Sequence, residues 1–131
     1  MARPAPRQRK IVLGDDEANV RRLVEVTLAS DEYVTLHASS GSEVLEVVRR
    51  ERPDLVLLDI NMPGDLNGLE VCRHIKGDPA NDGTAVIMLT AAVDEEQRRR
   101  ALDYGAIDYI TKPFSPLALL SRLESLFEEN R

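Results

Sequence analysis

The chain lacks the features that mark secreted, membrane-spanning and nucleic-acid-binding proteins. It has one cysteine, Cys72, which permits no internal disulfide and fits a reducing compartment. It has no signal-peptide segment and no apolar run long enough to cross a membrane, so we expect a cytoplasmic protein without membrane contact. Basic residues are outnumbered, and the net charge of −6 argues against direct nucleic-acid binding, because phosphate contact needs a clustered basic face.

What is present fits one globular domain. The 131 residues are 43% hydrophobic and 31% charged, which is sufficient for a single hydrophobic core under a charged surface. Residues 1–8 are basic and contain two prolines, and we expect them to form a flexible N-terminal arm. The folded domain is then predicted over residues 9–131.

Short apolar runs alternate five times with longer segments whose apolar residues recur at helical spacing. Strands are predicted at residues 10–13, 33–38, 55–58, 86–89 and 107–111. Helices are predicted at about 17–30, 41–52, 68–76, 95–104 and from 116 onward. Such alternation is typical of a doubly wound α/β fold, a three-layer (βα)5 sandwich with a parallel sheet between two layers of helices.

Helix ends are also recognisable. Ser40, Asp94 and Ser115 are predicted N-caps, and Gly105 is predicted to end a helix in the left-handed conformation. The last helix is expected to pack through a spaced apolar face formed by Leu117, Leu120, Leu123, Leu126 and Phe127. The polar connection 77–84 is expected to be exposed to solvent.

The central strand, Leu55 to Leu58, ends on a carboxylate at Asp59. Four consecutive apolar residues without alternation indicate a parallel strand that is covered on both faces. Ligands bind outside the carboxyl ends of such strands, so Asp59 is placed for chemistry. The alternative is that Asp59 only stabilises a turn or caps a helix.

Polar residues follow four of the predicted strands. They are Asp15, Asp16, Asp59, Thr90 and Lys112. Two like charges about 4 Å apart repel by roughly 4 kcal/mol at an effective dielectric constant near 20, so clustered carboxylates favour a divalent cation. An all-oxygen ligand set suits Mg²⁺ or Mn²⁺. A phosphoryl group is a natural partner of such a site, with an aspartate as nucleophile.

The order of these residues resembles the receiver domain of two-component response regulators, over about residues 9–128. The matching residues are Asp15, Asp16, Asp59, Met62, Pro63, Thr90, Ala91, Gly105, Ala106, Asp108, Tyr109, Lys112, Pro113 and Phe114. The resemblance implies a flavodoxin-like five-stranded sheet in the order 2-1-3-4-5. It also implies a signalling switch and not an enzyme, beyond self-catalysed phosphorylation and dephosphorylation.

The resemblance further implies a role for each acidic residue. Asp59 would be the phospho-acceptor, and its donor would be a sensor histidine kinase or a phosphotransfer protein. Asp16, Asp59 and the backbone carbonyl of Asn61 would bind Mg²⁺ (or Mn²⁺) directly, and Asp15 would bind it through a water. Asp16 can also be the N-cap of the following helix.

The resemblance also assigns the residues that would respond to the phosphoryl group. Lys112, before a cis Pro113, would bind its oxygens; Thr90 would donate a hydrogen bond to it, and the small Ala91 would leave it room. Thr90 and Tyr109 would then switch, and the changed face would control a downstream protein or an attached output domain. The alternative for Tyr109 is a half-buried strand residue.

One further implication concerns self-association. Asp108 and Arg122 match an aspartate and an arginine that pair between the two copies in phosphorylation-dependent homodimers of related receivers, and Arg98 matches a further basic position. The alternative is a solvated charged face, because exposed ion pairs contribute only about 0–1 kcal/mol.

Two other functions use related chemistry or folds. An aspartyl-phosphate hydrolase would need a second aspartate two residues after Asp59, where this chain has Asn61. A flavin-binding module would need a phosphate-binding loop after the first strand, where this chain is acidic. One departure from the receiver pattern is an extra residue between Pro63 and Gly68.

Overall fold

The computed structural model describes residues 8–91 and 94–129. Its strands are β1 (Arg9–Gly14), β2 (Tyr33–Ala38), β3 (Leu55–Asp59), β4 (Ala85–Thr90) and β5 (Asp108–Thr111). Its helices are α1 (Ala18–Thr27), α2 (Gly41–Glu51), α3 (Gly68–Gly77), the 3₁₀ turn η1 (Pro79–Asn81), α4 (Glu95–Asp103) and α5 (Pro116–Glu129). The strands are parallel and lie in the order β2-β1-β3-β4-β5, which confirms the predicted fold and strand order.

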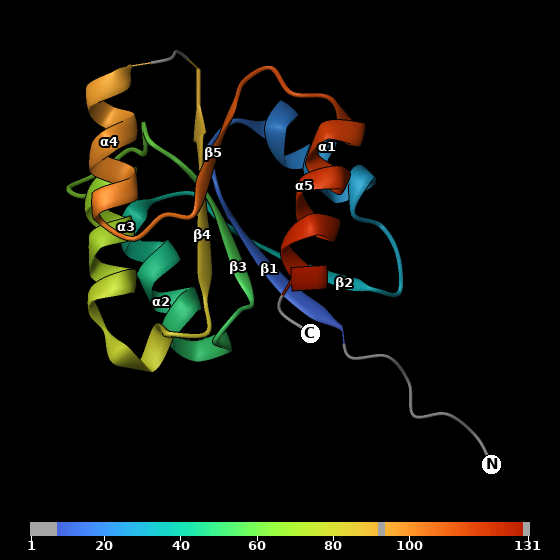
Figure 1. The fold of residues 1–131 in the computed structure, drawn as a ribbon, viewed down its shortest axis with the longest axis horizontal. Coiled ribbons are helices and arrows are strands. Elements are labelled where there is room, and N and C mark those ends of the chain that lie inside the picture. The colour runs from blue at the N-terminus through green and yellow to red at the C-terminus, as the bar shows by residue number, and fades with distance from the viewer. Residues whose placement is uncertain (1–7, 92–93, 130–131) are drawn as a thin grey trace.

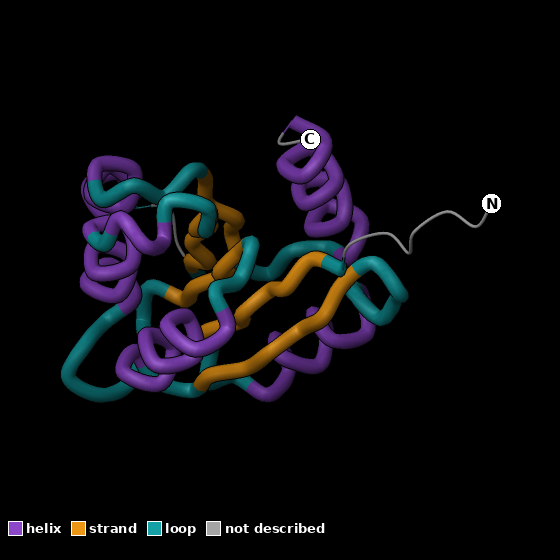
Figure 2. The backbone as a smooth tube through the Cα atoms, turned by 90° about the horizontal axis from the view of Figure 1, so that it is seen from below, coloured by secondary structure: helices purple, strands orange, loops and turns teal. Residues whose placement is uncertain are grey.

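The sheet lies between two layers of helices. Helices α2, α3 and α4 cover one face, and α1 and α5 cover the other (Figure 1). A second view shows the strands running between the helices (Figure 2). Each connection from one strand to the next therefore passes through a helix, and all strands point their carboxyl ends to the same edge of the sheet.

The core is divided by the sheet into two clusters, as the alternation of side chains along a strand requires. In β1, Ile11 and Leu13 pack toward α1 and α5, whereas Val12 packs toward α2 and α3. All five residues of β3 are buried, as expected for the central strand. The strand is thus held rigidly from both sides, and Asp59 stands at its carboxyl end.

The structure corrects the predicted apolar face of the last helix. Leu117 is 73% exposed, whereas Leu119 and Leu123 are fully buried against the sheet. Residues 119 and 123 are four apart and lie on one helical face, while residue 117 points about 200° away from residue 119. Leu120, Leu126 and Phe127 pack partly buried beside them.

The predicted helix ends are confirmed, with one exception. The Ser40 hydroxyl and the Asp94 carboxylate accept hydrogen bonds from the first turns of α2 and α4, and Gly105 has a φ of 105°. The exception concerns α1, whose N-cap is Glu17 and not Asp16. The Glu17 side chain makes no capping hydrogen bond, which leaves it available for other contacts.

Other segments fit the expectations in part. The connection 77–84 is largely exposed, but Thr84 is buried, and its hydroxyl is satisfied by donating to the Pro53 carbonyl at 2.7 Å. Most of the predicted N-terminal arm lies outside the described residues, and only Gln8 is seen, donating to the Asp31 carbonyl. Among the helices described, none has the length and apolarity needed to cross a membrane.

Candidate functional site

The parallel sheet brings the ends of distant strands together. Asp15 directly follows β1, Asp59 ends β3 and Thr90 ends β4. The backbone N–H of Lys112, just after β5, donates to the Thr90 carbonyl at 2.7 Å. Residues nearly 100 positions apart in the sequence therefore meet at one edge of the sheet.

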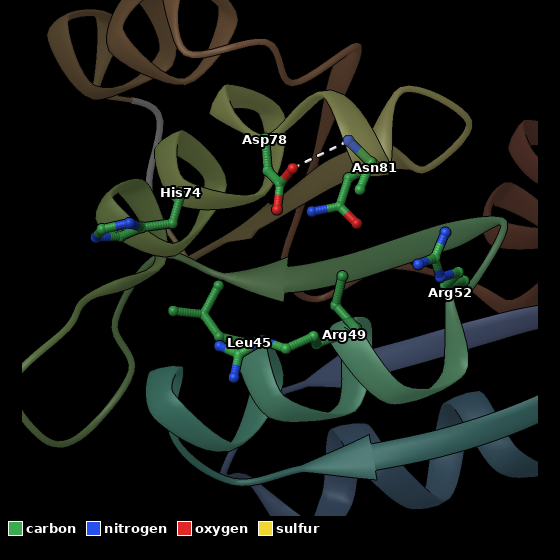
Figure 3. Close-up of a pocket in the computed structure, with 8 residues that line it drawn as sticks. Leu45, Arg49, Arg52, His74, Asp78 and Asn81 are labelled. Carbon is green, nitrogen blue, oxygen red and sulfur yellow. Dashed lines mark hydrogen bonds between the residues drawn. The ribbon is translucent and has the colours of Figure 1, made fainter.

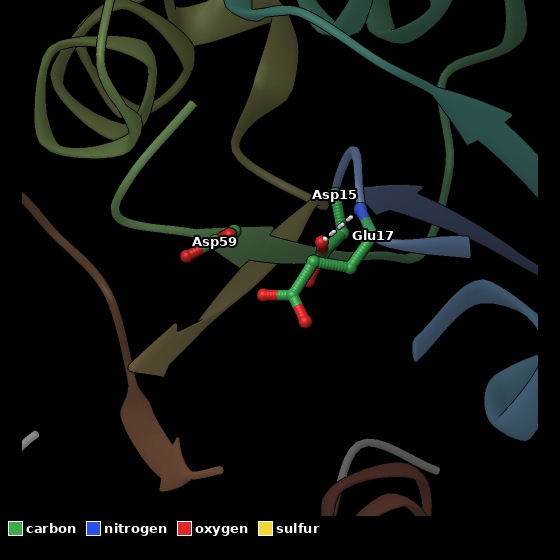
Figure 4. Close-up of side chains that lie close together, drawn as sticks. All are labelled: Asp15, Glu17 and Asp59. Atoms are coloured by element: carbon green, nitrogen blue, oxygen red, sulfur yellow. Dashed lines mark hydrogen bonds between the residues drawn. The ribbon is translucent and has the colours of Figure 1, made fainter. Parts of the chain in front are cut away.

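An ammonium group lies at the centre of this edge. Lys112 Nζ is 2.7 Å from Asp15 Oδ2, 3.1 Å from Glu17 Oε1 and 3.2 Å from Asp59 Oδ2. Asp15 and Glu17 lie in the turn between β1 and α1, Asp59 ends β3, and the three side chains lie close together (Figure 4). Asp15 also accepts a hydrogen bond from the Glu17 backbone N–H at 2.9 Å, which fixes the turn between β1 and α1.

Asp59 is buried at the end of the central strand and has a donor on each oxygen. The Asn61 backbone N–H donates to Oδ1 at 3.1 Å, and Lys112 donates to Oδ2. Burial raises the pKa of Asp59 above its ordinary value, while the Asn61 N–H and the Lys112 charge oppose this rise. The carboxylate is thus held in one orientation and is more basic than an exposed aspartate.

Lys112 is held in its charged form. Burial alone would lower the pKa of Lys112, but its close contacts with the Asp15 and Glu17 carboxylates and the charge of Asp59 outweigh burial and raise it. A permanent positive charge beside Asp59 is suited to binding an anionic group there.

The acidic residues could also hold a divalent cation. One carboxylate oxygen from each of Asp15, Glu17 and Asp59 lies within 4.8 Å of the others. Asp15 Oδ2 is buried and, despite its ion pair with Lys112, receives no well-aligned hydrogen bond, so it has spare capacity as a ligand. Hard oxygen ligands in this number fit Mg²⁺ or Mn²⁺. Asp16 is exposed and is not in this group.

The other predicted site residues surround this cluster. Thr90 is buried at the end of β4, and Ala91 and Asn61 are exposed beside it at the same edge. Tyr109 is half-buried in β5, and the Arg98 guanidinium carbon lies 4.5 Å from its ring centroid. Thr90 and Tyr109 line one small cavity of about 10 Å³ between β4 and α4.

Glu17 is the site residue that sequence reasoning missed. The available signal was a third acidic residue directly after Asp15 and Asp16. Its side chain reaches Lys112 because the backbone turns between β1 and α1, and that turn was not predictable from residue type alone.

The loop with the extra residue lies beside Asp59 and ends on Gly68. The Gly68 N–H donates to the Ile60 carbonyl at 2.8 Å, which joins the start of α3 to the end of β3. A Cβ on Gly68 would collide with the Asp59 carbonyl oxygen, so this close approach requires glycine. The additional length is accommodated before Gly68, in exposed residues 63–65 and 67 and the half-buried Leu66.

A larger hollow of about 200 Å³ lies elsewhere, between α2 and α3 (Figure 3). It is lined by the C-terminal parts of these helices, including Arg49, Arg52 and His74. Helices that follow parallel strands run back, so these ends lie toward the amino ends of the strands. None of the clustered carboxylates lines this hollow, and it is separate from the candidate site.

Known proteins have similar sequences and the same fold. Residues 11–124 match the family model of the response regulator receiver domain. The chain is 39% identical over 123 residues to the DNA-binding response regulator MtrA of Mycobacterium tuberculosis, covering 94% of this chain and 52% of that protein. It is 40% identical over 116 residues to the phosphate regulon transcriptional regulatory protein PhoB of Pseudomonas aeruginosa, covering 88% of this chain and 50% of that protein.

Solved structures agree with these sequence matches. The chemotaxis response regulator CheY4 of Vibrio cholerae has a TM-score of 0.83 at 28% identity, over 91% of this chain and 98% of that chain. The BeF3-activated receiver domain of Klebsiella pneumoniae RstA has a TM-score of 0.78 at 35% identity, over 88% of this chain and 95% of that chain. The chain spans about half the length of the curated relatives cited above. It belongs to the response regulator receiver domain family, the phosphorylation-dependent switches of two-component signalling.

Proposed function

We propose that Asp59 is the residue that receives the phosphoryl group. The observation that carries this proposal is the position of Asp59 at the end of the buried central strand, with Asn61 N–H on one oxygen and Lys112 on the other. A fixed carboxylate with a raised pKa is a better nucleophile than an exposed one. A sensor histidine kinase or a phosphotransfer protein is the proposed donor.

In the proposed reaction, an Asp59 oxygen attacks phosphorus and the bond from phosphorus to the donor's imidazole nitrogen breaks. The imidazole takes up a proton from water and leaves as the neutral ring, and an acyl phosphate remains on Asp59. Lys112 keeps its positive charge and donates to the phosphoryl oxygens. Because these groups belong to the receiver itself, we infer that it also reacts with small phosphodonors.

We propose a Mg²⁺ (or Mn²⁺) site formed by Asp16, Asp59 and the Asn61 carbonyl, with Asp15 acting through a water. The fit rests on Asp15 and Asp59, whose carboxylate oxygens lie close enough to share one ion, and on the spare capacity of Asp15 Oδ2. When bound, such an ion supplies charge that offsets the transferring phosphoryl oxygens. Asp16 would have to turn toward the cluster, which its exposed position permits.

We propose that Thr90 and Tyr109 transmit the change, with Ala91 leaving room for the phosphoryl group. The cavity beside Thr90 and Tyr109 holds about one water and is too small for a phenol ring. If Tyr109 turns inward, Thr90 and α4 must therefore shift. That shift would change the face of α4, β5 and α5, which we propose as the contact surface for a downstream protein, an attached output domain or a second copy.

Phosphorylation with acetyl phosphate tests the acceptor. In the presence of Mg²⁺, the intact protein should gain the mass of one phosphoryl group, and alkali should remove it. Asp59→Asn should abolish the gain, whereas Asp31→Asn, an exposed residue in the turn before β2, should not. Equal labelling of the Asp59→Asn variant would show that the acceptor is another residue.

A further inference from the structure

Lys112 has more carboxylate partners than its role toward a phosphoryl group requires. An ammonium group has three N–H donors, and three carboxylates lie within 3.2 Å of Nζ. Two of these contacts, to Glu17 and Asp59, are hydrogen bonds, and the contact to Asp15 is an ion pair. A phosphoryl group on Asp59 therefore competes for Lys112 with carboxylates that already surround its ammonium group.

The three carboxylates differ in how easily they can leave. The side chain of Asp15 is fully buried, that of Asp59 is 6% exposed, and that of Glu17 is 58% exposed. Asp15 is also fixed by the hydrogen bond from the Glu17 N–H. Of the three, Glu17 can turn into solvent at the lowest cost, because its carboxylate regains hydration when it leaves.

Glu17 has no visible structural duty that would explain this contact. It is the N-cap residue of α1, but its side chain makes no cap hydrogen bond and instead reaches across the site to a residue 95 positions away. Its carboxylate oxygen lies within 4.8 Å of the Asp59 carboxylate. A phosphodonor that approaches Asp59 therefore meets an additional negative charge.

We propose that Glu17 is a positioning residue that holds Lys112 in the unphosphorylated protein and must release it when Asp59 is phosphorylated. This proposal rests on the proposed role of Asp59. Glu17 slows phosphorylation in two ways: it competes with the phosphoryl oxygens for Lys112, and its charge repels the anionic donor. It thereby keeps the switch off when the donor is weak or scarce.

The test compares Glu17→Gln with the unmodified protein, using acetyl phosphate at saturating Mg²⁺. Glu17→Gln keeps the side-chain size and removes the charge, so phosphorylation should be about three- to tenfold faster. The difference should fall below about twofold near 1 M salt, where the screening length is about 3 Å. Glu46→Gln, an exposed charge change on α2, should behave like the unmodified protein.

Two measurements do not depend on phosphorylation. In metal-free protein, ¹⁵N NMR of the Lys112 ammonium should show faster proton exchange with water in Glu17→Gln, because one acceptor has become a weaker amide. Calorimetric titration should give a Mg²⁺ affinity that is lower in Glu17→Gln only through the lost charge and that equals the affinity of the unmodified protein near 1 M salt, since Glu17 is assigned to Lys112 and not to the metal.

The outcomes separate this inference from the proposed function. Equal rates in the two proteins, with labelling still on Asp59, would overturn the role of Glu17 alone. Slower labelling with a Mg²⁺ affinity that stays weaker near 1 M salt would also overturn it, because Glu17 would then be a metal ligand. Absence of labelling in the unmodified protein would contradict the acceptor itself, and the role of Glu17 with it.

Discussion

Arg122 Nη1 lies 2.8 Å from Asp108 Oδ2 in the same chain. The sequence predicted that these residues would pair between two copies. Both side chains are partly exposed, and arginine has five donors, so one contact within a chain does not prevent another between chains. A homodimer through α4, β5 and α5 would nevertheless have to share or exchange a contact that the monomer already makes.

The first prediction concerns this homodimer. We expect a monomer that dimerises when beryllofluoride occupies the phosphoryl position. Arg122→Glu should weaken the dimer about tenfold, because it places two acidic groups together at each copy of the contact. Adding Asp108→Arg should partly restore it, since the double variant keeps opposite charges. Sedimentation measures the mass, and an unchanged mass with and without beryllofluoride would exclude the dimer.

The second prediction concerns the metal. Asp16→Ala should lower Mg²⁺ affinity by about tenfold or more, because a direct ligand is lost. Its unfolding free energy should change by about 0.5 kcal/mol or less, because Asp16 is exposed. Calorimetric titration measures the affinity, with Glu46→Gln as the charge control. An Mg²⁺ titration that is unchanged by Asp16→Ala would remove Asp16 from the ligand set.

The third prediction concerns pH. Burial raises the pKa of Asp59 above its ordinary value of 3.8, so the folded state binds this proton more readily than the unfolded state. The stability from this group is present below pH 3.8 and is lost as pH rises through the raised pKa. Asp59→Asn should therefore be more stable than the unmodified protein at pH 7 in chelator, because Asp15 and Glu17 still neutralise Lys112.

Thermal unfolding across pH 3–8 tests this linkage. The stability difference between Asp59→Asn and the unmodified protein should shrink as pH falls toward 3.8 and below, where both proteins carry a neutral group at position 59. Asp31→Asn, an exposed site, should show no comparable trend. A stability difference that does not vary with pH would contradict the assigned cause.

The fourth prediction concerns Tyr109. The guanidinium of Arg98 lies over its ring at 4.5 Å, a cation–π contact worth about 0.5–1 kcal/mol at an exposed site. Arg98→Gln should free the ring to sample other rotamers, detectable by NMR of the Tyr109 side chain. Arg99→Gln, on the exposed side of α4, is the matched control. Identical ring dynamics in both variants would mean that Arg98 does not restrain Tyr109.

The fifth prediction concerns the junction of β3 and α3. Gly68→Ala should destabilise the fold by about 1–3 kcal/mol, because the new methyl group meets the backbone of Asp59 and Ile60. Phosphorylation of Asp59 should also be slower in Gly68→Ala, since the end of β3 must move. Gly77→Ala, at the open end of the same helix, should not destabilise, because nothing lies within 4 Å of its added Cβ. Equal stability of the two variants would contradict the required close approach.

The sequence was sufficient to predict the fold because its signals are local. Consecutive apolar residues without polar alternation identify strands that are covered on both faces. Ser40 and Asp94 identify helix starts through their side chains, and Gly105 identifies a helix end through its left-handed conformation. The meeting of Asp15, Asp59 and Lys112 also followed from the sequence, because parallel strands place all their carboxyl ends at one edge.

Only the tertiary structure decided which neighbouring side chain makes a given contact. Glu17, and not Asp16, reaches Lys112; Leu119, and not Leu117, faces the core; and Asp108 pairs with Arg122 inside one chain. In the first two cases the residue types are equally suitable, and the sequence alone does not fix which of the two faces the contact. In the third, the sequence does not decide whether the pair forms within one copy or between two. The choice depends on the backbone direction at a turn and the rotation of a helix, which packing against distant strands fixes.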